Sequence, residues 1–288
     1  MISPVKKYIP TMNIDPIWQN LAIGLAGAAL ISVVALLLKA LSVSGAVGAT
    51  LVGTITYGLG GWPLALPLLF FFTCSSILTA ITNEKKSGLK GIVKKAGPRD
   101  FWQVMANGGP GTLCVLFGYF TSDSMWYYFY LVGLCEAAAD TWATEVGTLS
   151  SRKVISVVSF KPVAPGISGG ISLVGTMALF AGSIGTASVA RFSGWNFQGT
   201  SLSISYPSLI CALAGIAGGL IDSVLGATIQ AHFRCKTCRR VVETATHCDH
   251  KTELIGGFKL INNDAVNVLS NITAILLAIG IFNLAELH

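Results

Sequence analysis

Runs of about 20 apolar residues recur along the whole chain, and this feature constrains the fold more than any other. A helix of that length crosses the hydrocarbon core of a bilayer and satisfies its own backbone, for which lipid offers no hydrogen-bond partner. Charged residues make up only 11% of the sequence, whereas soluble domains carry about 25%. The sequence therefore predicts an all-α fold, a polytopic transmembrane helix bundle of about eight helices, with seven to nine compatible with the pattern. The expected spans are residues 18–38, 43–60, 64–82, 104–120, 126–148, 170–188, 204–230 and 264–284.

Nothing in the sequence divides the chain into separate units. We see neither an internal repeat nor a low-complexity tract, so we expect residues 1–288 to form a single membrane domain. No cleavable signal peptide is expected, because roughly the first 17 residues are polar and the apolar run that follows is long enough to span. The chain is thus expected to be a multi-pass integral membrane protein.

Basic residues gather in three of the predicted connections. These hold 15 of the 19 Lys and Arg residues. They are Lys85, Lys86, Lys90, Lys94, Lys95 and Arg99; Arg152, Lys153 and Lys161; and Arg234, Lys236, Arg239, Arg240, Lys251 and Lys259. Because positive loops stay in the cytoplasm, we expect all three connections, including the long loop 231–262, and the active face to be cytoplasmic. The net charge of +6 then reflects orientation. Since aromatic residues are not interleaved with the basic ones, we exclude nucleic acid as a partner.

Rare acidic residues lie inside the spans, where each charge costs roughly 2.5–3.5 kcal/mol on insertion scales. The fifth span contains Glu136, Asp140 and Glu145. Glu136 and Asp140 are four apart and share a helix face, whereas Glu145 lies about 140° further round at ~100° per residue. Either the helix breaks near Thr144 or Glu145 serves elsewhere. A hydrogen-bonded packing role is the alternative to chemistry, more so for Glu136 than for Asp140.

Two later spans add further oxygen ligands. Asp222 is a lone acid among small residues of the seventh span. A polar stripe opens the eighth span, formed by Asn263, Asp264, Asn267, Ser270 and Asn271. Interhelical hydrogen bonding is one explanation of the stripe. Hard oxygen ligands also suit Mg²⁺, which binds through one or two carboxylates and substrate phosphates.

Two basic connections are rich in glycine. The first carries Arg99, Asp100, Gln103, Asn107, Gly108 and Gly109, and the second carries Lys161, Ser168, Gly169 and Gly170. A glycine-rich turn that enters a helix N-terminus presents free backbone N–H groups to an anion. Neither run is a Walker A motif, and a plain flexible turn is the alternative for each. With basic residues and acids nearby, the two runs together predict a phosphate site.

The last connection contains clustered cysteine and histidine residues. Cys235 and Cys238 are followed by His247, Cys248 and His250. This spacing is compatible with a zinc knuckle, and we take Cys235, Cys238, Cys248 and His250 as candidate ligands of a structural Zn²⁺. A cytoplasmic loop is a reducing setting, which disfavours a disulfide.

Five ordered motifs make the chain resemble a known family. They are GPRDFWQVMANGG at 97–109, EAAADTWATEVG at 136–147, KPVAPGISGGISLVGT at 161–176, GGLIDSVLGATIQ at 218–230 and NNDAVNVLS at 262–270. The chain resembles, over roughly residues 20–285, the phytyl-phosphate kinase and transmembrane-protein-nineteen-like family. This family includes the phytyl-phosphate kinases of plants and cyanobacteria and many uncharacterised membrane proteins. One departure is Ile167-Ser168, where that family would have Thr followed by a small polar residue.

The resemblance implies transfer of the γ-phosphoryl of a nucleoside triphosphate, with CTP favoured, to an isoprenyl monophosphate such as phytyl phosphate. It implies Mg²⁺ held by Asp140, Asp222 and Asp264. Asp140, Asp222, Lys161 and Arg99 would be catalytic. Substrate or nucleotide contacts would come from Asp100, Gln103, Asn107, Gly108, Gly109, Ser168, Gly169, Gly170, Glu136, Thr144, Glu145, Asn263 and Asn267. Phosphoryl transfer fits these residues because it needs positioning and charge neutralisation more than covalent chemistry.

Other functions stay open at this point. An isoprenol kinase or a lipid-phosphate cytidylyltransferase would use the same site residues. A transporter of a phosphorylated or anionic solute would explain the intramembrane acids, although the inverted repeats typical of transporters are not visible. An oligomer is compatible with the sequence.

Overall fold

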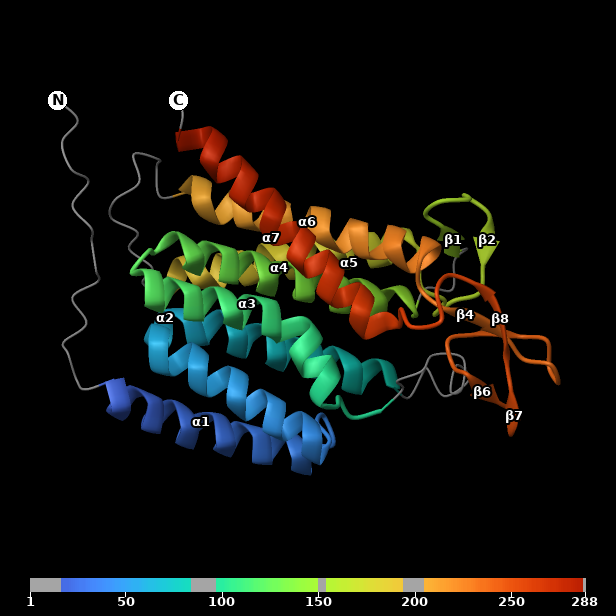
Figure 1. The fold of residues 1–288 in the computed structure, drawn as a ribbon, viewed down its shortest axis with the longest axis horizontal. Helices are drawn as coiled ribbons and strands as arrows, with labels where there is room; N and C mark the ends of the chain where they lie inside the picture. The colour runs from blue at the N-terminus through green and yellow to red at the C-terminus, as the bar shows by residue number, and fades with distance from the viewer. Residues whose placement is uncertain (1–16, 84–96, 150–153, 194–204, 287–288) are drawn as a thin grey trace.

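The chain folds into a bundle of long helices (Figure 1). The structure, a computed structural model, describes residues 17–83, 97–149, 154–193 and 205–286. Within these residues the helices are α1 (Ile17–Leu37), α2 (Val43–Asn83), α3 (Phe101–Thr121), α4 (Met125–Gly147), α5 (Leu173–Phe192), α6 (Ser205–Thr228) and α7 (Asn263–Glu286). The predicted all-α bundle is confirmed, with span boundaries within a few residues of those expected.

Helix α2 contains two of the predicted spans. Gly61 has non-helical torsion angles, φ 63° and ψ −158°, in the middle of the element. The chain reverses there, so α2 begins and ends at the same side of the bundle (Figure 1). Only glycine adopts this region readily, because a Cβ would crowd the neighbouring backbone. The seven helical elements therefore provide eight passes through the bundle.

Helix α4 forms the centre of the bundle. Its residues from Tyr128 to Ala139 are all buried, and it packs against α2, α3, α5, α6 and α7. Helix α6 approaches it closely at Gly218, where an added Cβ would lie 2.6 Å from Glu136 Cγ. The other helices thereby shield the acids of α4 from lipid.

Among the described residues, five elements are long and apolar enough to cross a membrane by length and composition. They are α1, α2, α5, α6 and α7. Helix α4 carries three carboxylates, and helix α3 contains Gln103, Asn107 and several glycines, which lowers their mean hydropathy. Large apolar side chains such as Leu113 and Phe120 are nevertheless exposed along α3, as expected of a helix that faces lipid.

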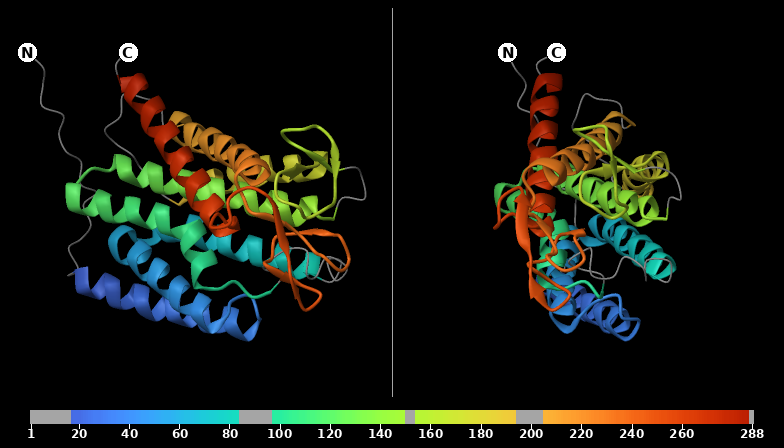
Figure 2. Two further views of the ribbon diagram at one scale, coloured as in Figure 1. Left: turned by 45° about the vertical axis from the view of Figure 1, so that its right-hand side comes forward. Right: turned by 90° about the vertical axis from the view of Figure 1, so that its right-hand side faces the viewer.

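Short strands gather at one end of the bundle and were not predicted (Figure 1). Strand β1 (Val154–Ser156) pairs with β2 (Pro162–Val163) and β3 (Gly170–Ile171). Strand β4 (His232–Arg234) pairs with β5 (Val241–Val242) and β8 (Glu253–Gly256), and β6 (Thr246–His247) pairs with β7 (His250–Lys251). The segment between α6 and α7 thus lies across the helix ends (Figure 2).

This strand-bearing end is also the basic end. Among the Lys and Arg residues that the structure describes, Arg191 alone lies at the opposite end, in the last turn of α5. The α1–α2 turn, which contains Lys39, lies on the same side of the bundle as the strands (Figure 1). Seven predicted loop residues lie outside the described residues, namely Lys85, Lys86, Lys90, Lys94, Lys95, Arg152 and Lys153.

The reversal at Gly61 gives the first testable prediction. Gly61→Ala should lower stability by about 1–3 kcal/mol, because a non-glycine residue must be held in a glycine-only conformation. The nearest side-chain atom to an added Cβ is Pro63 Cδ at 3.7 Å, so the cost comes from the backbone rather than from a clash. The apparent melting temperature of the purified protein in detergent measures this loss.

Gly280→Ala is the matched control. Gly280 lies in α7, and a Cβ added there meets nothing within 4 Å. Replacing an exposed helical glycine with alanine should leave the free energy of unfolding unchanged or raise it by about 0.5–1 kcal/mol at most. The melting temperature should therefore stay the same or rise slightly. Equal melting temperatures for both variants would contradict a glycine-dependent reversal.

Candidate active site

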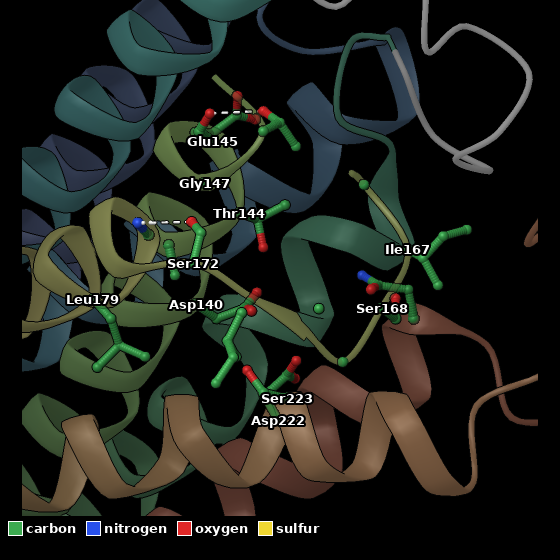
Figure 3. Close-up of a pocket in the computed structure, with 18 of the residues that line it drawn as sticks. Asp140, Thr144, Glu145, Gly147, Ile167, Ser168, Ser172, Leu179, Asp222 and Ser223 are labelled. Carbon is green, nitrogen blue, oxygen red and sulfur yellow. Dashed lines mark hydrogen bonds between the residues drawn. The ribbon is translucent and has the colours of Figure 1, made fainter. Parts of the chain in front are cut away.

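A polar cavity opens where the basic end meets the bundle. Its volume is about 210 Å³. Its lining comes from helices α2 to α7, from the segment before α3, from the α4–α5 connection and from the α6–α7 loop. The close-up in Figure 3 shows Asp140 and Thr144 of α4 and Asp222 of α6 on one side, with Ser168 facing them. All five sequence motifs contribute residues to the lining of this cavity.

Asp140 and Asp222 form the acidic floor of the cavity. Their carboxyl groups lie within hydrogen-bonding reach of each other, and Asp140 also contacts the Thr144 side chain. Asp222 is 8% exposed. Two carboxylates this close must share a proton or a cation, since like charges without water between them repel strongly. The pair is therefore suited to holding a divalent cation through oxygen atoms.

Glu136 lies one helical turn deeper than Asp140 and does not line the cavity. Ser270 Oγ donates to Glu136 Oε1 at 2.7 Å, and Asn271 Nδ2 donates to Glu136 Oε2 at 2.8 Å. Ser270 Oγ also lies 3.0 Å from Asp222 Oδ2. The stripe on α7 thus anchors Glu136 and connects it to the acidic pair. For Glu136 this geometry matches the packing alternative.

The start of α7 reaches the cavity only in part. Asn263 lines it, whereas Asp264 does not. Among the described residues, Asp264 forms no metal-ligand cluster with Asp140 and Asp222. Asn267 lies 3.1 Å from Asn107 Oδ1, and with its amide turned over it donates to Asp222 Oδ2 at 3.3 Å. Asn267 is therefore better placed beside the acidic pair than Asp264.

Glu145 occupies a separate corner of the cavity. Helix α4 runs without a break to Gly147, so Glu145 points away from Asp140 and toward α2. Its carboxylate accepts from Thr79 Oγ1 at 3.0 Å and from Thr82 Oγ1. Arg99 Nη2 donates to Thr79 Oγ1 at 3.4 Å. The sequence left open whether the helix breaks near Thr144 or Glu145 serves elsewhere, and the structure shows an unbroken helix. The sequence analysis missed Thr79 and Thr82 because they lie in an apolar span.

Arg99 is held in place by its backbone. Its N–H donates to Ala40 O at 3.0 Å, and its carbonyl accepts from Ser42 N at 3.0 Å. The α1–α2 turn thus clamps the segment before α3. Burial lowers the pKa of the Arg99 guanidinium, and the Glu145 charge opposes that shift. An arginine in such a setting stays protonated and can bind phosphate oxygens in pairs.

The glycines of the first glycine-rich run lie within a helix and do not form the turn that the sequence suggested. Asp100 and Gln103 form a capping box, with Gln103 N donating to Asp100 Oδ1 at 2.9 Å and Asp100 N donating to Gln103 Oε1 at 3.1 Å. This cap starts α3 at Phe101, earlier than predicted. Gly108 and Gly109 consequently lie inside α3, where the helix uses the backbone amides.

The second glycine-rich run does form a loop beside the acids. Gly166 to Gly170 line the cavity ahead of α5. Gly169 has φ +79° and packs against Ala227 of α6, whose Cβ would lie 2.4 Å from an added Cβ. At position 168, the backbone N–H donates to Glu243 Oε1 at 2.9 Å. That amide is therefore engaged by a carboxylate.

Glu243 is the main site residue that the sequence analysis missed. It comes from the loop between α6 and α7 and lines the cavity at 7% exposure. Ser168 Oγ donates to Glu243 Oε1 at 2.5 Å, and Gln230 Nε2 donates to Ser168 Oγ at 2.8 Å. Burial raises the pKa of Glu243, and the Ser168 hydrogen bonds oppose the rise. No spacing rule links residues 75 positions apart, so only the fold brings them together.

Lys161 does not reach the cavity. It lies exposed immediately before β2, and its carbonyl accepts from Ser156 N at 2.9 Å. The cavity lining does not include it. Arg99 is the predicted catalytic cation that lines the cavity.

A second, apolar groove runs between α1, α2 and α3. Its volume is about 170 Å³, and side chains such as Ile31, Val52 and Phe72 line it. The lining covers Ile23 to Ile31 of α1, roughly 12 Å at 1.5 Å per residue. Arg99 and Gln103 line both this groove and the polar cavity. The groove therefore ends where the polar cavity begins.

The predicted zinc residues gather outside the cavity, with one change. Ligand atoms of Cys235, Cys238, His247 and Cys248 all lie within 4.8 Å of one another. His247 thus takes the place assigned to His250. The His250 ring instead faces the backbone, with Nδ1 2.7 Å from Cys248 O.

Comparison with known proteins bears on this arrangement. The family model described as "Integral membrane protein DUF92" matches residues 26–275. Protein PGR of Arabidopsis thaliana is 31% identical over 252 residues, which cover 81% of this chain and 85% of PGR. The chloroplastic protein VTE6 of the same plant is 27% identical over 252 residues, covering 84% of this chain and 66% of VTE6. An uncharacterized membrane protein of Methanocaldococcus jannaschii is 29% identical over 206 residues, covering 70% of this chain and 81% of that protein. No solved structure matches the chain.

The anchoring of Glu136 gives a second prediction. Asn271→Ala removes the donor to Glu136 Oε2 and to Gly133 O, both within the buried core. Each buried group that loses its partner costs about 1–3 kcal/mol. Thermal unfolding in detergent should show a clear loss of stability. Asn283→Ala, an exposed position on the same helix, serves as the control. A shift as small as that of the control would contradict the buried network.

Proposed function

The chain belongs to the DUF92 family of integral membrane proteins. We propose that it is an isoprenyl-phosphate kinase. It would transfer the γ-phosphoryl of a nucleoside triphosphate to an isoprenyl monophosphate such as phytyl phosphate. The oxygen of the lipid phosphate would form the new P–O bond, and the bond from the γ-phosphorus to the β-phosphate oxygen would break. The products are an isoprenyl diphosphate and a nucleoside diphosphate.

One observation carries this proposal. An apolar groove and a polar, acid-lined cavity meet at Arg99 and Gln103. A lipid phosphate has the same division, with an apolar tail and a charged head. Its tail would lie in the groove, and its head would lie at Arg99, beside the acids. A small soluble anion would bind in the polar cavity alone and would not contact the apolar groove.

The acidic pair fits a metal-assisted phosphoryl transfer. The carboxyl groups of Asp140 and Asp222 lie so close together that a bound cation would relieve their repulsion. Both groups offer only oxygen atoms as ligands, and Mg²⁺ prefers oxygen ligands. Asp140 and Asp222 would hold Mg²⁺, which supplies charge neutralisation to the phosphates. Asn267, which can donate to Asp222, would hold that carboxylate in orientation.

The remaining residues of the cavity have defined tasks. Arg99 would bind oxygens of the lipid phosphate and reduce the repulsion between two anionic substrates. The Gly166–Gly170 loop, fixed by Glu243, would form the wall against which the nucleotide phosphates rest. The acceptor is already an anion, so no strong general base is required. This accounts for a site without a histidine among its described lining residues.

The basic end is proposed to face the cytoplasm. Its excess of Lys and Arg follows the positive-inside rule, and a nucleoside triphosphate would reach the cavity from that side. CTP is the donor that the family resemblance favours.

A lipid-phosphate cytidylyltransferase is the second candidate, because the same acids and groove would serve it. Labelled CTP separates the two reactions. The γ-label would appear on the lipid if the protein is a kinase, and the α-label would appear if it transfers a cytidylyl group. A transporter would transfer neither.

The third prediction concerns catalysis. Purified protein with Mg²⁺ and γ-labelled CTP, ATP, UTP or GTP should label phytyl, farnesyl or geranylgeranyl monophosphate. Asp140→Asn and Asp222→Asn should each lower kcat roughly a hundredfold or more, since each removes charge from the site that neutralises the transferred group. Thin-layer analysis of the lipid fraction measures the product.

Asp123→Asn is the matched control for this assay. Asp123 is exposed in the α3–α4 turn at the opposite end of the bundle, where it accepts from Met125 N at 2.9 Å. An asparagine there can still accept that bond, so activity should be unchanged. Absence of lipid labelling from every nucleotide would overturn the proposed function.

The fourth prediction concerns the groove. Ala49→Phe should fill part of it and raise KM for the lipid phosphate about tenfold, which corresponds to roughly 1.4 kcal/mol, while KM for the nucleotide stays unchanged. Ala49 lines the groove. Val47→Phe on the same helix is the control, because Val47 is 61% exposed and lies outside the lining. Equal effects of both variants on the lipid KM would argue against the groove as the tail site.

A further inference from the structure

The loop between α6 and α7 has very little hydrophobic core of its own. Its buried apolar cluster consists of Ala231, Phe233 and Val242. Strands β4, β5 and β8 form one small sheet, and β6 pairs only with β7. Units of fewer than about 40 residues seldom fold on so small a core without disulfides or a metal. A bound metal would add the stability that so small a core lacks.

Two hairpin turns of this loop bring four ligand atoms together. Cys235 and Cys238 belong to the turn between β4 and β5, and His247 and Cys248 belong to the hairpin of β6 and β7. The Nδ1 atom of His247 lies 3.5 Å from Cys238 Sγ and 3.2 Å from Cys248 Sγ. Ligands at Zn–S and Zn–N distances of about 2.3 and 2.0 Å in a tetrahedron lie roughly 3.3–3.8 Å apart. The 3.5 Å separation lies in this range, the 3.2 Å separation lies just below it, and all four ligand atoms lie within 4.8 Å of one another.

The backbone of both turns is shaped for ligation. Cys248 and Asp249 have φ values of 51° and 60°, a pair of left-handed residues that hairpin turns normally reserve for Asn-Gly. Arg239, directly after Cys238, is also left-handed at φ 61°. Cys238 N donates to Cys235 Sγ at 3.5 Å. Strained turns that aim two cysteines at one point need a compensating interaction.

We propose that Cys235, Cys238, His247 and Cys248 bind one structural Zn²⁺, which fixes Glu243 against Ser168 and so shapes the wall of the cavity. Three sulfur atoms and one nitrogen atom in a closed set are typical of structural zinc rather than of a catalytic metal with an open position. The site is separate from the cavity lining. Its existence is therefore independent of the kinase proposal.

Glu243 connects the two places. It lies between the cysteine pair and the His247-Cys248 pair, so a bound ion would tie down the chain on both sides of it. Its carboxylate accepts from Ser168 N and Ser168 Oγ. Glu243 is thus a positioning residue for the Gly166–Gly170 loop, and the metal holds Glu243 in turn.

Metal content is the direct test. The full-length protein, purified in detergent without chelator, should contain one zinc per chain by mass spectrometry. His247→Ala and Cys238→Ser should lose it, whereas His250→Ala should keep it because the His250 ring faces Cys248 O. Cobalt-exchanged wild-type protein should show thiolate-to-cobalt charge transfer and tetrahedral ligand-field bands. This second measurement does not depend on a variant that folds.

Three results would overturn the site: no zinc or cobalt bound by wild-type protein, zinc lost in His250→Ala but kept in His247→Ala, or fewer than the seven thiols of the sequence in the denatured chain. The last result would indicate a disulfide.

Coupling to the cavity needs a separate measurement. Glu243→Ala should lower the melting temperature of zinc-loaded protein, and the same substitution should have a much smaller effect in the His247→Ala background. Glu243→Gln keeps an oxygen that can accept from Ser168 and should restore most of the loss. Strictly additive losses would overturn the positioning role of the metal.

Discussion

The rest of the structure depends on the close approach of Asp140 and Asp222 in the interior of the bundle. Two carboxylates there are stable only with a proton or a cation between them and with hydrogen-bond partners around them. Helices α4 and α6 meet at Gly218 closely enough to bring the acids together, and α7 places the Ser270 hydroxyl between Glu136 and Asp222. The central position of α4 follows from the same need, because lipid contact would leave its acids unsolvated.

The bundle divides into two functional halves that meet at Arg99. Helices α4 to α7 contribute the acids and their hydrogen-bond partners, whereas α1, α2 and the start of α3 enclose the apolar groove. The α1–α2 turn hydrogen-bonds to the backbone of Arg99. The Arg99 side chain donates to Thr79, which lies beside Glu145. One short segment thus fixes the residue that both halves share. The reversal at Gly61 contributes to this arrangement, because it returns α2 to the basic end of the bundle and so places Thr79 beside Glu145.

The sequence predicted the parts of the fold that depend on local composition. Hydropathy gave the helices because each span must be apolar over its own length. It failed where a residue's partner is distant in sequence. Gly108 and Gly109 looked like a turn, yet the Asp100 cap and burial against neighbouring helices keep them in α3. Glu243 was missed because nothing near it marks a site. His247 and His250 flank the same cysteine, and only the geometry of the β6–β7 hairpin separates them.

The two sides of the cavity are stabilised by different interactions, namely helix packing around the acids and a small loop behind the Gly166–Gly170 wall. The acidic floor belongs to tightly packed helices, so it opens only with the bundle. The Gly166–Gly170 wall depends on Glu243, which sits on a loop whose core is three side chains. Segments with few buried apolar contacts unfold locally at lower free energy than the core. The wall therefore needs a support that the acids do not need, and the proposed zinc site would supply it by holding Glu243 against Ser168.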